Sequence, residues 1–151
     1  MRRALSVLTI ALVPTAVALA VTPPKPAGGK WKAKTFGSDD SKGGFSFNKA
    51  KTKIGSFRVT PGNGASTVCG TAQFKVKGQV KLSTATRAGF TVWIIGKNAP
   101  KTHDGAVGRK VTITQAGAKK TGKLKIFFLT TKSGDGTLNF GDCELQFSVS
   151  K

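Results

Sequence analysis

Apolar and polar residues alternate along most of this chain. Phe74 and Val76 alternate with lysines, and Val80 and Leu82 do the same a few residues later. A period of two places successive side chains on opposite faces of a β-strand. No segment after residue 20 carries a helical apolar stripe longer than two turns. The pattern therefore predicts β-strands with apolar residues inside and lysines outside.

The alternation recurs often enough to build a whole domain. It is found at residues 45–47, 111–113, 138–140 and 143–149, and residues 54–60 add a short run rich in β-branched and aromatic residues. Glycine-containing turns such as residues 133–136 separate the runs. About eight short strands separated by turns predict an all-β domain, an antiparallel β-sandwich of the immunoglobulin-like or jelly-roll-like kind. A closed β-barrel is the alternative, because the sequence does not fix the order of the strands.

Two segments, residues 89–96 and 123–130, are apolar on both faces. Their second faces define a candidate apolar patch of Trp93, Ile95, Phe127 and Leu129. An exposed patch of this kind is typical of a protein- or carbohydrate-binding module, since a tryptophan can stack on a sugar ring. We favour the other interpretation, in which the N-terminal segment bearing Trp31 and Phe36 covers these residues.

The N-terminal residues divide the chain into three parts. Residues 1–20 combine Arg2 and Arg3 with a short apolar run and small residues at its end, which predicts a secretory signal peptide. Residues 21–30 are rich in proline and then glycine and predict a flexible linker. Residues 31–151 are expected to form a single domain without a transmembrane segment. We expect the mature protein to be secreted, extracellular or associated with the cell envelope.

The chain has two cysteines, Cys69 and Cys143. In an exported protein such a pair predicts a disulfide, here closing a loop of about 75 residues. Cys69 lies on the parity opposite to that of Phe74, so Gly70 would have to break the register and turn it inward. The chain has a single histidine, His103, so we expect no metal site.

The chain is strongly basic, with 25 lysines and arginines against 6 acidic residues and a formal charge of +19. Lysine provides most of this charge. A lysine ammonium group is a hydrated point charge that attracts polyanions diffusely, whereas the planar guanidinium group of arginine binds a phosphate or carboxylate through two hydrogen bonds. The plainer interpretation is a solvated, soluble surface. The candidate contacts for an anionic cell-wall glycan or another polyanion are Lys49, Lys51, Lys53, Lys75, Lys77, Lys81, Lys119, Lys120, Lys123 and Lys125. Specific nucleic-acid binding is not expected, because the chain has no tyrosine and few arginines.

The residues for catalysis are few. A secreted hydrolase would have to use His103, Asp104, Asp142 and Glu144, and the chain has no Gly-x-Ser-x-Gly motif. Asp39, Asp40 and Asp135 lie in turn-like contexts, where aspartate usually bonds the backbone. We therefore expect a non-catalytic module without a cofactor, and keep the hydrolase as an alternative.

Several short motifs occur together along the chain: residues 44–47, 54–59, 93–96 and 122–128, together with Cys69 and Cys143. This set resembles the motifs of small secreted bacterial β-sandwich proteins that have no assigned activity. The resemblance covers most of residues 44–150. It implies a sandwich with a paired cysteine, and it brings no catalytic or binding residue with it.

Overall fold

The computed structural model describes residues 21–36, 41–62, 68–78, 80–98 and 106–151, which form strands and loops and contain no helix. The predicted signal peptide lies outside these residues. The strands are β1 (Lys30–Thr35), β2 (Lys42–Ser46), β3 (Lys53–Ile54), β4 (Phe57–Thr60), β5 (Phe74–Lys77), β6 (Val80–Arg87), β7 (Phe90–Ile95), β8 (Lys97–Asn98), β9 (Ala106–Val107), β10 (Arg109–Gln115), β11 (Ala118–Phe128), β12 (Ser133–Phe140) and β13 (Cys143–Ser150).

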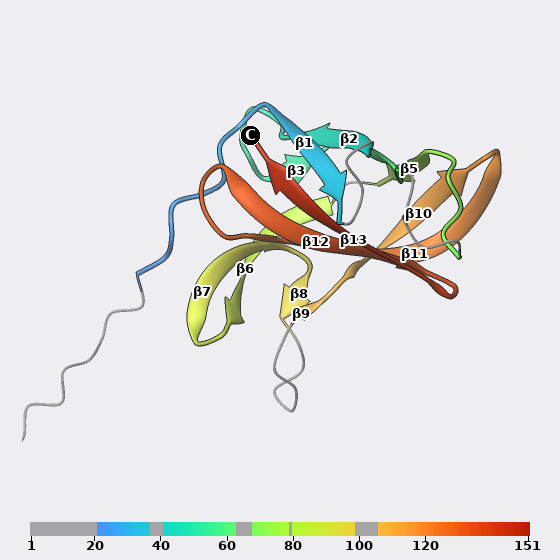
Figure 1. Ribbon diagram of the computed structural model, residues 1–151. Coiled ribbons are helices and arrows are strands. Elements are labelled where there is room, and N and C mark those ends of the chain that lie inside the picture. The colour runs from blue at the N-terminus through green and yellow to red at the C-terminus, as the bar shows by residue number, and fades with distance from the viewer. Residues whose placement is uncertain (1–20, 37–40, 63–67, 79, 99–105) are drawn as a thin grey trace, which may run out of the picture.

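Eight strands close into an antiparallel barrel. Their order is β10-β5-β4-β2-β1-β13-β12-β11, and β11 pairs back with β10 (Figure 1). The prediction of a sandwich is therefore wrong, and the barrel given as the alternative is correct. The alternation of residues shows which side of a strand faces inward but not which strands are neighbours, so it cannot separate two facing sheets from one closed sheet.

The length of β11 makes this topology possible. One edge of β11 pairs with β12, and the other pairs first with β10 through residues 118–124 and then with β7 through residues 126–128. β6 and β3 continue the sheet beyond β7. Eleven residues of a single strand thus serve the closed barrel and the extension that carries the β6–β7 hairpin.

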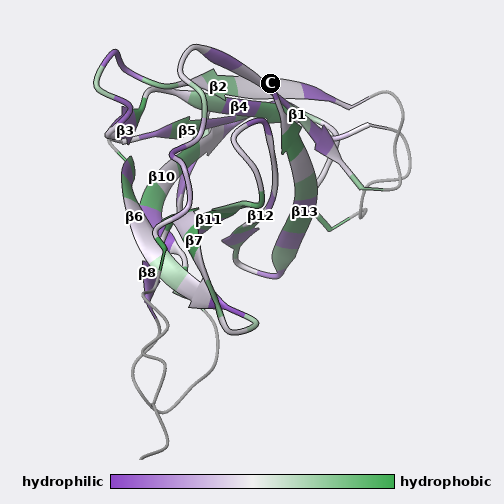
Figure 2. Ribbon diagram, turned by 90° about the vertical axis from the view of Figure 1, so that its left-hand side faces the viewer, coloured by the Kyte–Doolittle hydropathy of each residue, from purple (hydrophilic) through white to green (hydrophobic). Residues whose placement is uncertain are grey.

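The barrel interior is packed with the alternate apolar residues that the sequence predicts. Along β13 the buried positions begin at Cys143 and recur at every second residue, giving the banded hydropathy of that strand in Figure 2. Phe57 lies 5.1 Å from Phe147 between ring centroids, and all three of Phe57, Phe74 and Phe147 are fully buried. An eight-stranded barrel is just wide enough for side chains to fill it, so this interior is a core and not a channel.

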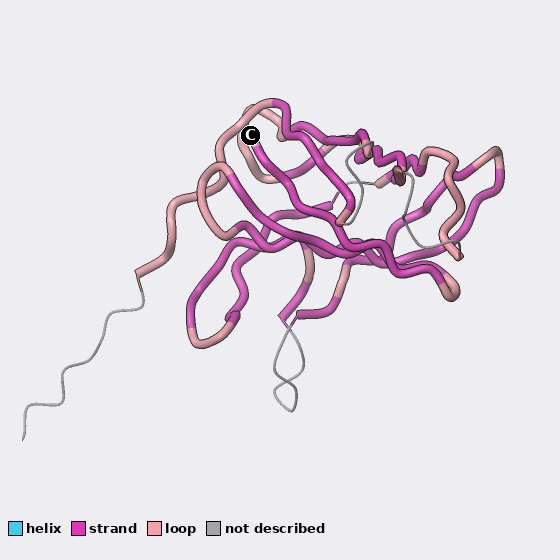
Figure 3. The backbone as a smooth tube through the Cα atoms, in the orientation of Figure 1, coloured by secondary structure: helices cyan, strands magenta, loops and turns pink. Residues whose placement is uncertain are grey.

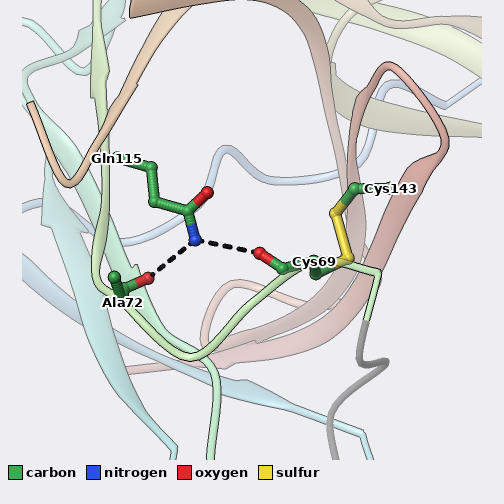
Figure 4. Close-up of a disulfide and its surroundings, with 4 residues drawn as sticks. All are labelled: Cys69, Ala72, Gln115 and Cys143. Carbon is green, nitrogen blue, oxygen red and sulfur yellow. Dashed lines mark hydrogen bonds between the residues drawn. A yellow bond between two sulfur atoms is a disulfide. The ribbon is translucent and has the colours of Figure 1, made fainter. Parts of the chain in front are cut away.

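The disulfide between Cys69 and Cys143 is confirmed, with a Cα–Cα distance of 4.9 Å. Cys69 lies in a turn before β5, and Gly70 has a φ of +70°, a left-handed conformation that glycine adopts without a steric penalty. The side-chain amide of Gln115 donates to the carbonyls of Cys69 and Ala72 and fastens the same turn to β10 (Figure 4). The alternation of inward and outward side chains does not apply to Cys69, because this residue lies in a turn and not in a strand. It therefore does not prevent the disulfide.

The predicted linker comprises residues 21–30; residues 21–29 run as a loop beside the barrel, and Lys30 is the first residue of β1 (Figure 3). The amide of Ala27 donates to the carbonyl of Thr131 at 2.7 Å, and the indole of Trp31 donates to the carbonyl of Ala27 at 2.9 Å. Pro26 is buried. This segment is therefore fastened along the turn that joins β11 to β12.

Candidate functional site

The outward positions of four neighbouring barrel strands are occupied mainly by basic residues and threonines. β4, β5, β10 and β11 are consecutive around the barrel, and their buried positions are occupied by apolar residues and one glycine. Six outward basic side chains define what we call the basic face: Arg58, Lys75, Lys77, Lys110, Lys119 and Lys123.

Strand register fixes the spacing of the basic face. Arg58 on β4 is the cross-strand partner of Lys75 on β5. Lys75 is also the partner of Thr114 on β10, and Thr114 is the partner of Lys119 on β11. Neighbouring strands lie about 4.8 Å apart, and alternate residues on one strand about 6.8 Å apart. These spacings apply to the backbone positions that carry the six basic side chains, so the register places those positions close together on one surface.

Lys110 and Lys123 form a directly opposed cross-strand pair at one end of the basic face. Like charges directly opposite each other destabilise a sheet. β4, β5, β10 and β11 contain no aspartate or glutamate, so no residue of these strands can neutralise the face. The nearest carboxylate along this row is that of Glu144, which is separated from Lys123 by Asn139. The arrangement raises the positive potential of the surface at some cost to the stability of the sheet.

Four of the predicted lysine contacts, Lys75, Lys77, Lys119 and Lys123, lie on the basic face. The register adds Arg58, which lies between two buried residues, and Lys110, which precedes the buried Val111; neither is among the contacts predicted from the sequence. Only the pairing of strands far apart in the chain reveals that these two residues join the same surface.

The other predicted lysines lie elsewhere. Lys53 pairs with Lys81 between β3 and β6, and Lys49 and Lys51 lie in the turn before β3. The ammonium group of Lys120 lies 5.5 Å from the ring centroid of Phe140.

Lys125 also lies on the outer side of β11, but it is not part of the basic face. Its ammonium group lies 5.5 Å from the ring centroid of Phe127 and donates to the carbonyl of Ala106. The lysine surface is thus one dense face together with scattered charges.

The candidate apolar patch is not assembled on one face. Ile95 pairs with Ile126 and is fully buried, so it faces the core. Phe127 is 8% exposed and lies on the opposite side of the sheet in a separate cluster with Ala85 and Ile94. Leu129 is 54% exposed, beyond the end of β11.

Trp93, the central residue of the predicted patch, is partly buried against the main core. Its indole N–H donates to the carbonyl of Pro23 at 2.7 Å, and the ammonium group of Lys25 lies 5.1 Å from its ring. The N-terminal segment does cover Trp93, but through Pro23 and Lys25. Trp31 lies in the core instead, and Phe36 is exposed.

The carboxylates that the structure describes are scattered. Asp135 accepts two hydrogen bonds from Arg87, with a shortest N–O distance of 2.9 Å. Glu144 is exposed and accepts from the amide of Gln146. Asp142 is exposed in the turn before β13.

The remaining candidates for hydrolysis or metal binding are not placed by the structure. His103 and Asp104 lie outside the described residues, and so do Asp39 and Asp40. Within the described part of the chain, no three His, Cys, Asp or Glu side chains are grouped as metal ligands would be. The same residues include no helix long and apolar enough to cross a membrane.

No protein-family model matches this chain, and neither a curated protein nor a solved structure matches it significantly.

Proposed function

We propose that the protein is a non-catalytic extracellular module that holds anionic polymers against the basic face. One observation carries the proposal: the pairing of four consecutive strands brings six basic side chains onto one surface, and these strands contain no acidic residue. A surface that served only solubility would gain from interspersed charges of both signs, which these strands lack.

The composition of the face indicates the kind of ligand. Five of its six cations are lysines, which present hydrated point charges and not the bidentate fork that arginine offers to a single phosphate or carboxylate. Threonine hydroxyls at Thr112, Thr114 and Thr121 stand between the charges. This combination suits a flexible polymer with repeated charges and hydroxyl groups, such as an acidic glycan of a cell wall.

The expected binding is electrostatic, so salt should weaken it. The Debye length is about 8 Å at physiological ionic strength, comparable to the spacing of charges on the face. The proposed secretory signal in residues 1–20 would deliver the module to the compartment in which such polymers occur.

The proposal is tested by measuring how much protein is retained on immobilised polygalacturonate, an acidic glycan, in a salt series from about 0.05 to about 0.5 M. Immobilised dextran, which is neutral, is the control polymer. The test variant changes Lys75, Lys77 and Lys119 to threonine, the residue already present between them. The matched control changes Lys30, Lys32 and Lys34 on β1, also exposed at alternate positions, to threonine. β1 lies opposite β10 in the barrel order, so the two variants lose the same charge from different sides.

We expect the face variant to bind about 3- to 100-fold more weakly than the control, because each exposed ion pair contributes a small, additive amount. Equal weakening by both variants would show that net charge alone matters and would overturn the assignment to the basic face. Retention that resists high salt but is lost in Trp93→Ala would favour the apolar alternative.

A further inference from the structure

A hollow of about 580 Å³ lies at the Lys110–Lys123 end of the basic face. It is bounded by the short β8–β9 ribbon and the outer side of β10, β11 and the β12–β13 turn. Its lining residues are Lys97, Val107, Gly108, Lys110, Thr121, Gly122, Lys123, Asn139, Phe140 and Gly141. The volume falls within the range of small-molecule sites, about 300–1,000 Å³.

The lining combines charged groups with neutral polar groups. Lys97, Lys110 and Lys123 bring three ammonium groups, and the lining contains no carboxylate. Thr121 and Asn139 supply a hydroxyl and a side-chain amide, which both donate and accept hydrogen bonds. The site therefore offers charge to an anion and neutral polar partners to hydroxyl groups.

Glycine and apolar residues complete the hollow. A Cβ atom at Gly108 would stand 3.0 Å from the Cβ of Lys123, so glycine lets the chain between β9 and β10 pass against the lysine stem. Val107, which is 39% exposed, provides apolar surface, whereas the ring of Phe140 is 6% exposed and belongs to the core. A sugar ring has an apolar face and a rim of hydroxyl groups, and an acidic sugar adds one charged substituent.

We infer that this hollow binds one acidic sugar unit of the polymer and gives the module a preferred point of attachment. The inference rests on the proposed function, because Lys110 and Lys123 belong to both surfaces. The lysines hold the carboxylate or phosphate group of the sugar, while Thr121 and Asn139 bind its hydroxyl groups. The rest of the chain of sugars extends along the basic face.

The inference is tested by titrating the isotope-labelled protein with trigalacturonate and following the amide signals by NMR. Glucose 6-phosphate replaces it in a second arm, which separates a phosphate from a carboxylate ligand, and neutral maltotriose is the third arm. We expect saturable shifts confined to the amides of residues 108–110, 121–123 and 139–141 with the acidic sugars. Shifts spread evenly over the basic face, or equal shifts with maltotriose, would overturn the inference.

A variant that keeps every charge separates the hollow from the face. Thr121→Leu with Asn139→Leu removes both neutral polar partners and fills part of the hollow. Ser46→Leu with Ser150→Leu is the matched control, since both serines are exposed on strands adjoining β1. We expect the first variant to bind trigalacturonate at least about tenfold more weakly than the control, because the hydroxyl groups of the sugar would lose their hydrogen-bond partners.

The polymer assay distinguishes the two possible failures. Retention on polygalacturonate should weaken in the Thr121→Leu, Asn139→Leu variant but should not be lost, since the diffuse attraction depends on the unchanged charges. Unaltered trigalacturonate binding in that variant would refute the hollow and leave the polymer-binding proposal standing. Absence of polymer retention in the wild-type protein would refute the proposed function itself. Where leucine disturbs folding, Thr121→Val with Asn139→Ala makes the same comparison without added bulk.

Discussion

Removing the disulfide should cost this barrel a large part of its stability. The bond joins residues 74 positions apart, and the chain between them contains all strands from β5 to β12. Cross-linking a loop of that length lowers the entropy of the unfolded chain by an amount equivalent to about 4.5 kcal/mol near room temperature. A typical domain is stable by only about 5–15 kcal/mol. The Cys69→Ala, Cys143→Ala variant should therefore remain folded only marginally.

Alanine is the appropriate replacement because Cys69 and Cys143 are only 2% and 3% exposed. A serine hydroxyl at either position would be buried and would add its own penalty. Urea unfolding monitored by circular dichroism measures the effect. With a dependence of roughly 1–3 kcal/mol per molar urea, the midpoint should fall by roughly 1.5–4.5 M.

Gln115→Ala is the control, since it removes the side-chain bonds to the carbonyls of Cys69 and Ala72 but leaves the disulfide intact. Its loss should be about 1 kcal/mol, as for ordinary hydrogen bonds. A double-alanine variant that loses no more than this control would refute the loop-closure argument. It would mean that the barrel already restrains the turn before β5 without a covalent link.

Three further predictions concern packing and the N-terminal segment. Gly136→Ala would place a Cβ atom 2.7 Å from the ring of Phe147, so thermal unfolding should show a loss of stability of about 1–3 kcal/mol. An unchanged melting temperature would mean that the ring of Phe147 does not pack against Gly136. Trp93→Phe removes the indole N–H that donates to the carbonyl of Pro23, and hydrogen exchange at the amide of Ala27, which donates to Thr131, should accelerate while the barrel strands stay protected; unchanged exchange at Ala27 would show that the indole does not hold this segment. Asp135→Asn weakens the half-exposed pair with Arg87, and chemical denaturation should show a loss below about 1 kcal/mol; a loss above about 2 kcal/mol would mean that the pair is far less screened than its exposure indicates.

The sequence by itself determined the local features of this protein. Alternation on β5 and β13 predicted which side chains are buried, because the pleat of a strand places every second residue on the same face regardless of its neighbours. The disulfide was predictable for another reason, since Cys69 and Cys143 are the two cysteines of the chain and have no other cysteine to pair with. The absence of a long apolar helical stripe matches the all-β structure.

Only the tertiary structure decided how these strands associate. The two edges of β11 accept three strands and close a barrel where a sandwich was expected, and no local pattern records that choice. The same pairing brings Arg58 and Lys110 beside lysines that are distant in the chain. It also places Ile95 and Phe127 on opposite sides of the sheet, which separates the predicted apolar patch. Parity is a property of a single strand, whereas a surface is made by the register between strands, and that register depends on contacts across the whole barrel.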